Sequence, residues 1–294
     1  MIEDIFHSLT GKAAVALQKS DDAVLYGIRA WREVHKIPLG SNIIVSGLDT
    51  TPMLAAVVAA GLRPVIADID ADTLQPTVKT LQAAKIDNTV AVLVKHFAGY
   101  PCSMDEIWAW CKARRYMLMD DMSHCVPTRY KTWQNGSWPS DMTYAAFDAG
   151  SVLCSPDQSV IKIVRSFSRH VPETFQGLAR RYDQSYVQWS YERRKAIWEQ
   201  YTKAFEDIEE LELPWEDSKQ IKQSRHFYVM RGPEDFAGRE KNRFDHNSNF
   251  KDVGFHDCGP LPNLYDFLNR SIFLPLDVEP SEAKTVIDTV KKKL

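Results

Sequence analysis

The chain has 294 residues, and 44% of them are hydrophobic, which is enough to fill the core of one large domain or of a large and a small one. The 36 Lys and Arg residues nearly balance the 39 Asp and Glu residues, and the formal net charge of −3 argues against a general nucleic-acid-binding protein. The longest mostly apolar run, residues 53–62, is too short to cross a bilayer, and no signal-peptide pattern is evident. We therefore expect a soluble, cytoplasmic protein with no membrane or nucleic-acid partner.

The cysteines favour a reducing compartment. Their number, five, is odd, and no pair has the Cys-x-x-Cys spacing. We expect free thiols at Cys102, Cys111, Cys125, Cys154 and Cys258. A metal site can be drawn from two histidines and two cysteines, but no ligand spacing supports it: His96, Cys102, His124 and Cys125. The sequence therefore predicts no bound metal.

The first two-thirds of the chain alternate between strand-like and helix-like segments. In chain order we expect a strand over 42–46, a helix over 52–60, a strand over 64–69, a helix over 73–84, a strand over 89–94, a helix over 104–115, and strands over 116–119, 143–147 and 159–164. Pro52 fits the first turn of its helix. Ser103 and Glu106 have the spacing of a capping box. Repeated strand–helix units of this length predict an α/β fold, with a mainly parallel sheet sandwiched by helices.

The pattern changes after about residue 185. Residues 184–211 predict one long helix rich in Trp, Tyr, Arg and Glu, residues 225–231 a strand, and residues 281–294 a closing helix. We therefore expect a large α/β domain over residues 1–185 and a small C-terminal α+β domain over residues 186–294. The aromatic residues of the long helix are expected to pack between the domains or between subunits.

Six segments, in order and at nearly the right spacing, resemble one family of enzymes. The clearest are GLRPVIADID at residues 61–70, HFAGYPCSMD at 96–105 and MDDMSH at 119–124; residues 20–31, 191–196 and 274–276 complete the series. The chain resembles the sugar aminotransferases of the DegT/DnrJ/EryC1/StrS family. This resemblance implies fold type I of the enzymes that depend on pyridoxal phosphate (PLP). It also implies a homodimer with two shared active sites.

The resemblance places the cofactor residues as well. Asp121 falls on the carboxylate that pairs with the pyridine nitrogen, and His124 falls where the family has Gln or His near the cofactor. Ser151 falls on the lysine that forms the Schiff base, and a serine hydroxyl cannot form an imine. The other interpretation of the two retained residues is structural: Asp121 caps a turn, and His124 is a half-buried histidine with satisfied hydrogen bonds.

The residues that match the phosphate site are changed too. Asp21 and Asp22 replace a Gly-Thr pair at a helix N-terminus, where their carboxylates repel a phosphate and can cap the helix themselves. Ala146 replaces a phosphate-binding serine, and Thr50 replaces an aromatic residue near the ring. Lys162, inside a predicted strand, offers no substitute amine.

These replacements predict a degenerate sugar-aminotransferase-like protein, without bound PLP and without transaminase activity. We expect a non-catalytic subunit, in a homodimer or in a heterodimer with an active paralogue, or a binder of a metabolite or nucleotide sugar in a polysaccharide or natural-product sugar pathway. The alternative is a lysine-independent enzyme that holds PLP or pyridoxamine phosphate (PMP) through Asp121 and acts on a nucleotide-linked keto sugar, with His124 as its base. A pure interaction protein is the third hypothesis.

Overall fold

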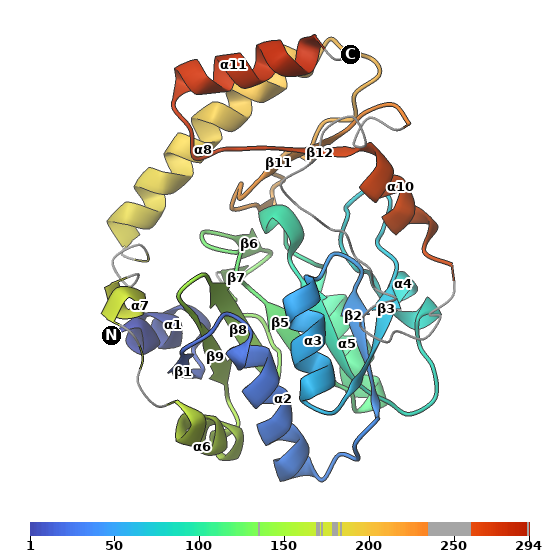
Figure 1. The fold of residues 1–294 in the computed structure, drawn as a ribbon, viewed down its shortest axis with the longest axis vertical. Helices are drawn as coiled ribbons and strands as arrows, with labels where there is room; N and C mark the ends of the chain where they lie inside the picture. Colours follow the sequence, from blue (N-terminus) through green and yellow to red (C-terminus); the bar gives the residue numbers. More distant parts are fainter. Residues whose placement is uncertain are drawn as a thin grey trace.

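The architecture is built on one central sheet. The computed structural model describes residues 1–134, 136–168, 171, 173–177, 182, 184–234, 260–292 and 294. Among these residues the sheet has seven strands, in the order β1-β9-β8-β5-β4-β2-β3 (Figure 1). The strands are β1 (Ala13–Leu17), β2 (Asn42–Ser46), β3 (Arg63–Ala67), β4 (Thr89–Lys95), β5 (Met117–Asp121), β8 (Met142–Phe147) and β9 (Gly150–Ser155).

The sheet is mainly parallel, as the alternation of strand-like and helix-like segments predicts. The pairs β3–β2, β2–β4, β4–β5 and β5–β8 are all parallel, whereas β9 runs antiparallel to β8 and to β1. Residues 42–46 are buried along their whole length, because helices cover both faces of the sheet. The carboxyl ends of the parallel strands therefore meet at one edge, where open α/β sheets bind ligands.

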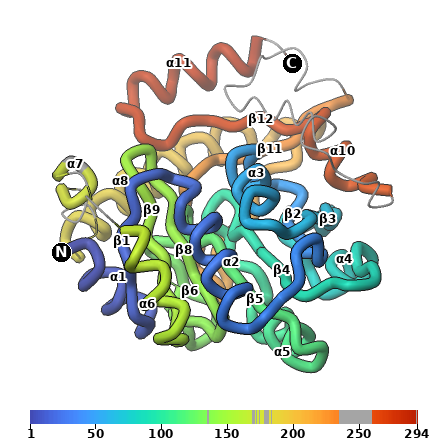
Figure 2. The backbone as a smooth tube through the Cα atoms, turned by 60° about the horizontal axis from the view of Figure 1, so that its bottom comes forward, coloured from blue at the N-terminus to red at the C-terminus, as the bar shows by residue number. Residues whose placement is uncertain are grey.

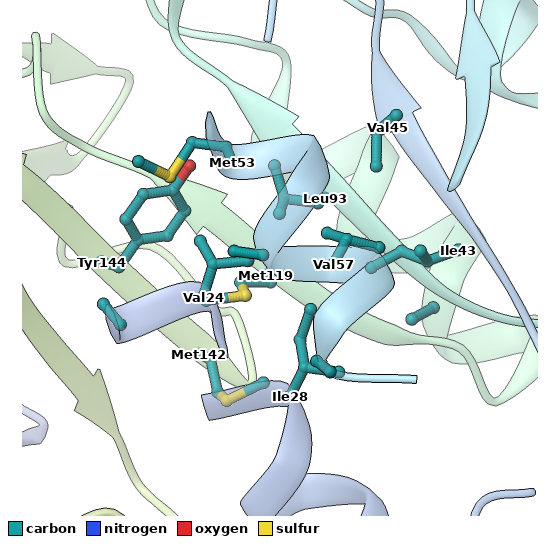
Figure 3. Packing of buried hydrophobic residues seen from close by; sticks show 14 of the residues in the cluster. Val24, Ile28, Ile43, Val45, Met53, Val57, Leu93, Met119, Met142 and Tyr144 are labelled. Carbon is teal, nitrogen blue, oxygen red and sulfur yellow. The ribbon is translucent and has the colours of Figure 1, made fainter. Parts of the chain in front are cut away.

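Helices cover the two faces of the sheet. They are α1 (Ile2–Thr10), α2 (Asp22–His35), α3 (Thr51–Ala59), α4 (Val78–Ala83), α5 (Met104–Arg114), α6 (Gln158–Phe167) and α7 (Glu173–Gly177). Side chains of α2, α3 and α6 fill one layer, and those of α1, α4 and α5 fill the other. Figure 3 shows the first layer, where Val24 and Ile28 of α2 meet Met53 and Val57 of α3 above the strands.

The C-terminal part adds a third hydrophobic cluster. The elements of this part are α8 (Gln184–Phe205), β11 (Tyr228–Arg231), α10 (Pro262–Arg270), β12 (Ser271–Leu274) and α11 (Pro280–Lys291), of which α10 packs in the cluster of α2, α3 and α6 instead. Trp198, Tyr201 and Phe205 of α8 pack against Tyr228 of β11 and the apolar side of α11. Figures 1 and 2 show α8 and α11 together on one side of the molecule, away from α5 and α6.

Short elements connect the two parts. A second small sheet contains β6 (Arg129–Tyr130), β7 (Trp133–Gln134) and β10 (Ile221–Lys222), and the 3-10 turn η1 (Phe97–Gly99) follows β4. Because β10 comes from the C-terminal part and pairs with β6, the backbone of the two parts is hydrogen-bonded together. The domain division at residue 185 stays a prediction.

Most predicted elements of the sheet are confirmed, but one is wrong. The strands expected over 42–46, 64–69, 89–94, 116–119 and 143–147 are all present within two residues at each end. Residues 159–164, expected to form a strand, lie instead in α6. The carboxylate of Asp157 accepts the backbone N–H groups of Ser159 and Val160, which caps a helix at this point. A short β-branched run alone did not distinguish a strand from a buried helix face.

Three smaller expectations also need correction. The helix expected over 73–84 is only α4 (Val78–Ala83), because Asp70 accepts the backbone N–H of Thr73 and holds the preceding residues in a turn. Ser103 makes no side-chain cap at the start of α5. The helix that begins at Gln184 ends at Phe205 rather than at residue 211.

Candidate functional site

Charged side chains gather at the carboxyl edge of the sheet. Lys95 is the last residue of β4 and Asp121 the last residue of β5, and the two are register partners on adjacent parallel strands. The Lys95 Nζ lies 2.5 Å from Asp121 Oδ2, and both side chains are buried. Asp49 follows β2, and neither of its carboxylate oxygens makes a well-formed hydrogen bond among the described residues. The site therefore contains one ammonium group and two carboxyl groups away from water.

The ion pair sets the charge state of Asp121. Burial by itself would raise the pKa of Asp121, but the Lys95 ammonium and hydrogen bonds from Ser123 hold it below its usual range. Burial would likewise lower the pKa of Lys95, but the charges of Asp121 and Asp49 raise it. Both groups are therefore charged at neutral pH, and the Lys95 amine is protonated rather than free to act as a nucleophile.

Asp49 behaves differently from Asp121. Burial raises the pKa of Asp49 to about 7, and the charge of Lys95 opposes this shift only in part. The Lys95 ammonium contacts Asp121 directly, so it neutralises the charge of Asp121 more than that of Asp49. A carboxyl group with a pKa near 7 can gain or lose a proton at physiological pH.

Two histidines stack beside this cluster. The rings of His124 and His226 are 4.0 Å apart with an interplanar angle of 20°. Burial and the mutual effect of the two rings lower the pKa of His124 well below its usual value, and burial lowers that of His226 to about 3. Both imidazoles are thus neutral at pH 7. His124 is half-buried, as one interpretation of the sequence expects, but its Nδ1 makes no hydrogen bond among the described residues.

A cleft of about 790 Å³ lies between this edge of the sheet and the first half of α8. His124 and His226 line it on one side, and Tyr186, Trp189 and Arg194 line it on the other. Arg194 is oriented by hydrogen bonds to Ser190 Oγ at 2.6 Å and to the carbonyl oxygen of Ser224 at 3.3 Å. The cleft thus offers aromatic surfaces, the two cationic groups of Arg193 and Arg194, and the carboxylates of Asp148 and Asp277 to a ligand.

Ser151 does not line the cleft, and its side chain caps α2 instead. It is fully buried on β9, where its hydroxyl donates to the carbonyl oxygen of Lys19 at 2.6 Å and accepts the N–H of Ala23 at 3.1 Å. The carboxylate of Asp22 accepts the N–H of Lys19 at 3.0 Å. Asp21 makes no side-chain cap, so the expectation that both aspartates cap α2 is corrected: Ser151 satisfies an N–H group of the first turn instead.

The remaining predicted residues lie as follows. The N–H of Ala146 on β8 donates to Ser123 Oγ at 2.9 Å, and Thr50 is the N-cap residue of α3 without a side-chain cap bond. Lys162 is exposed on α6, not inside a strand. Four cysteines are buried and free among the described residues, and Cys258 lies outside them. In the same part of the chain, no group of three potential ligands could hold a metal ion.

Sequence reasoning missed Asp49, Lys95 and His226. The sequence places Lys95 directly after the apolar run 89–94, but only the structure shows that its side chain is buried and therefore needs a negative partner. The parallel strand over 116–119 supplies that partner at the same edge. Asp49 and His226 lie in loops that only the folded chain brings to this edge.

The fold and the site together define a class of protein. A mainly parallel sheet sandwiched by helices, followed by a small α+β part, agrees with fold type I, which the resemblance implies. A family model described as the DegT/DnrJ/EryC1/StrS aminotransferase family matches residues 2–163, more than half of the chain. The chain belongs to that family.

Solved structures agree on the fold over 99% of this chain. Helicobacter pylori PseC, an aminotransferase involved in the biosynthesis of pseudoaminic acid, superposes with a TM-score of 0.84 at 16% identity and is covered to 90%. The aminotransferase TlmJ from Streptoalloteichus hindustanus gives 0.82 at 21% identity and is covered to 89%.

A curated relative shares part of the sequence. The spore coat polysaccharide biosynthesis protein SpsC of Bacillus subtilis is 28% identical over 167 residues, which are 54% of this chain and 42% of that protein. The match thus spans less than half of the relative. Among the described residues, no helix is long and apolar enough to cross a membrane.

Proposed function

We propose that this chain is a sugar-aminotransferase-like protein of a polysaccharide pathway that does not carry out PLP-dependent transamination. The observation that carries the proposal is the position of Ser151. Its hydroxyl is buried and committed to the N-terminus of α2, and it offers no amine for an imine. The described part of α6 supplies no replacement, because Lys162 is exposed to solvent.

The residues at this edge do not fit covalently held PLP. The cofactor needs an amine for its aldehyde, a free carboxylate for its ring nitrogen and donors for its phosphate. Asp121 is present but is paired with Lys95, and one N–H group at the start of α2 is already bonded to Ser151. The buried carboxylate of Asp22 adds negative charge where a phosphate would approach.

The cleft suits a ligand with an anionic group and a planar or sugar ring. Arg194 and Arg193 supply positive charge, and Tyr186 and Trp189 supply surfaces on which rings can stack. The names of SpsC and PseC support a sugar pathway. We therefore propose that the chain binds a nucleotide sugar or a related metabolite, or serves as a non-catalytic subunit in a cytoplasmic homodimer or in a heterodimer with an active paralogue.

The first experiment is calorimetric titration with PLP and with PMP, checked by absorbance near the cofactor band. We expect no saturable binding of either compound. Saturable binding that is lost in Asp121→Ala would contradict the proposal. Light scattering of the chain, alone and with active paralogues, tests the subunit arrangement.

A second titration tests the cleft with a nucleotide sugar such as UDP-glucose. Arg193 is exposed at the rim and lies over the ring of Trp189, so Arg193→Ala should weaken binding about ten-fold or more. Lys203→Ala is the matched control, because it removes one exposed positive charge from α8 outside the cleft lining. Equal affinities of the two variants would count against binding in this cleft.

One observation favours the lysine-independent enzyme as the second candidate. His124 is neutral and lines the cleft, so its imidazole can accept a proton from a bound substrate. In that case PMP would bind tightly, and His124→Asn would keep the binding but lose turnover of a keto sugar. Absence of PMP binding would remove this candidate.

A further inference from the structure

We propose that Lys95 is a built-in counter-ion that takes the place of a cationic ligand nitrogen at Asp121, so that this position is filled from within the chain. The inference rests on the proposed function and deepens it. It explains how a buried carboxylate at the ligand edge remains ionised without a cofactor. It also identifies Lys95 as the residue that keeps a pyridine ring from pairing with Asp121.

The geometry gives both carboxylate oxygens of Asp121 a donor. Lys95 Nζ lies 2.5 Å from Oδ2, while the backbone N–H of Ser123 donates to Oδ1 at 2.8 Å and the Ser123 hydroxyl donates to the same oxygen. The exposed fraction is 8% for the Lys95 side chain and 2% for that of Asp121. Each carboxylate oxygen thus already has a charged or polar donor.

A ring nitrogen that took the place of the present partner of Asp121 Oδ2 would displace the Lys95 ammonium. The displaced group would be left buried next to Asp49 alone, and a buried charge that loses its partner is strongly unfavourable. The titratable groups that interact electrostatically with Lys95 are Asp49, Asp121, His124, Cys125 and His226. Both histidines are neutral, so they offer no competing positive charge to Asp121.

At the N-terminus of α2, too, the chain's own side chains occupy groups that a ligand would otherwise bind. Ser151 Oγ accepts the N–H of Ala23, and the carboxylate of Asp22 accepts the N–H of Lys19. The chain therefore supplies its own acceptors where an anion would bind and its own cation where a ring nitrogen would bind. Of these replacements, Lys95 is the one that a single substitution can remove while leaving the helix cap intact.

The test uses pyridoxine, which carries the ring nitrogen but neither the aldehyde nor the phosphate. Binding is measured by calorimetry and by the shift in Tm for the wild-type protein, for Lys95→Met and for Lys95→Gln. We expect no binding to the wild type and a gain of about ten-fold or more in affinity for both variants. The gain should disappear when Asp121→Asn is added. The neutral glutamine keeps a hydrogen-bond donor and serves if Lys95→Met does not fold.

Lys12→Met is the matched control, because Lys12 is also buried but donates to Ser140 and Thr143 instead of Asp121. It should gain no affinity for pyridoxine. Wild-type affinity equal to that of the Lys95 variants would overturn the inference, and so would variants that gain nothing. Binding of PLP or PMP by the wild type is a separate result that overturns the proposed function, so the two failures can be told apart.

Discussion

At the scale of one residue, two hydrogen bonds fix the role of the buried Ser151 hydroxyl. The group both donates to Lys19 and accepts from Ala23, and a protonated amine has donors only. A lysine at this position could not satisfy the N–H of Ala23 in the same way. The local structure around α2 is therefore matched to serine.

Replacing Ser151 with alanine should lower the free energy of unfolding by about 1–2 kcal/mol, because the loss of the helix cap leaves the buried N–H of Ala23 without its acceptor, while the carbonyl oxygen of Lys19 keeps the N–H of Asp22. Urea unfolding measures this change. Ser159→Ala is the control, since Ser159 is exposed on α6 and its loss should cost less than about 0.5 kcal/mol. A Ser151→Ala variant as stable as the control would show that the cap contributes nothing.

Asp49 predicts a dependence of stability on pH. Burial raises its pKa from 3.8 to about 7, so between these values the folded state holds a proton that the unfolded state releases. Stability therefore falls as pH rises through this window. Asp49→Asn removes the effect and should stabilise the protein at pH 8 by at most about 4 kcal/mol, with little change at pH 4.

Thermal unfolding of Asp49→Asn and the wild type between pH 4 and pH 8 measures this difference. Asp148→Asn, which removes an exposed carboxylate from the rim of the cleft, should change stability by less than about 0.5 kcal/mol throughout. A constant difference between Asp49→Asn and the wild type across the pH range would contradict the assignment.

At the scale of elements, α6 is the helix that follows β9, the last strand of the central sheet in chain order. The segment was expected to be a strand, but Asp157 caps a helix there, and Val160, Ile161 and Val164 face the core at helical spacing. The reversed strand β9 precedes it and pairs with β1, which the sequence did not predict. Lys162 is carried to the solvent side as a result.

Asp157→Ala should therefore destabilise the protein by about 1 kcal/mol, through loss of the bonds to Ser159 and Val160. Asp157→Asn should cost much less, because asparagine caps as well as aspartate while losing the charge that faces His35. Chemical denaturation of both variants distinguishes them. Similar losses in the two would assign the effect to the contact with His35 rather than to the cap.

At the scale of the whole molecule, α8 holds the C-terminal part together and lines the cleft. Trp198 is buried against Tyr228 and lies under Arg225, whereas Trp189 on the same helix is 52% exposed at the cleft. One helix therefore presents one face to the core and another to the cleft.

Trp198→Ala should lower the free energy of unfolding by about 3–5 kcal/mol, because it leaves a large cavity in the third hydrophobic cluster. Trp189→Ala, the matched control on the same helix, should change stability by less than about 1 kcal/mol but weaken binding of a nucleotide sugar. Comparable losses of stability in the two variants would show that the two faces are not distinct.

The sequence by itself determined the α/β class, most strands of the parallel sheet, the family and the absence of an amine at Ser151. These properties follow from local hydrophobic periodicity and from residue identity. Only the tertiary structure decided what Ser151 does instead and which cation neutralises Asp121. Those answers depend on residues far apart in the chain. Lys95 at the end of β4 contacts Asp121 at the end of the adjacent strand β5, and Ser151 on β9 accepts the N–H of Ala23 on α2. Such contacts leave no periodic signal in the sequence, because they are set by strand order and register.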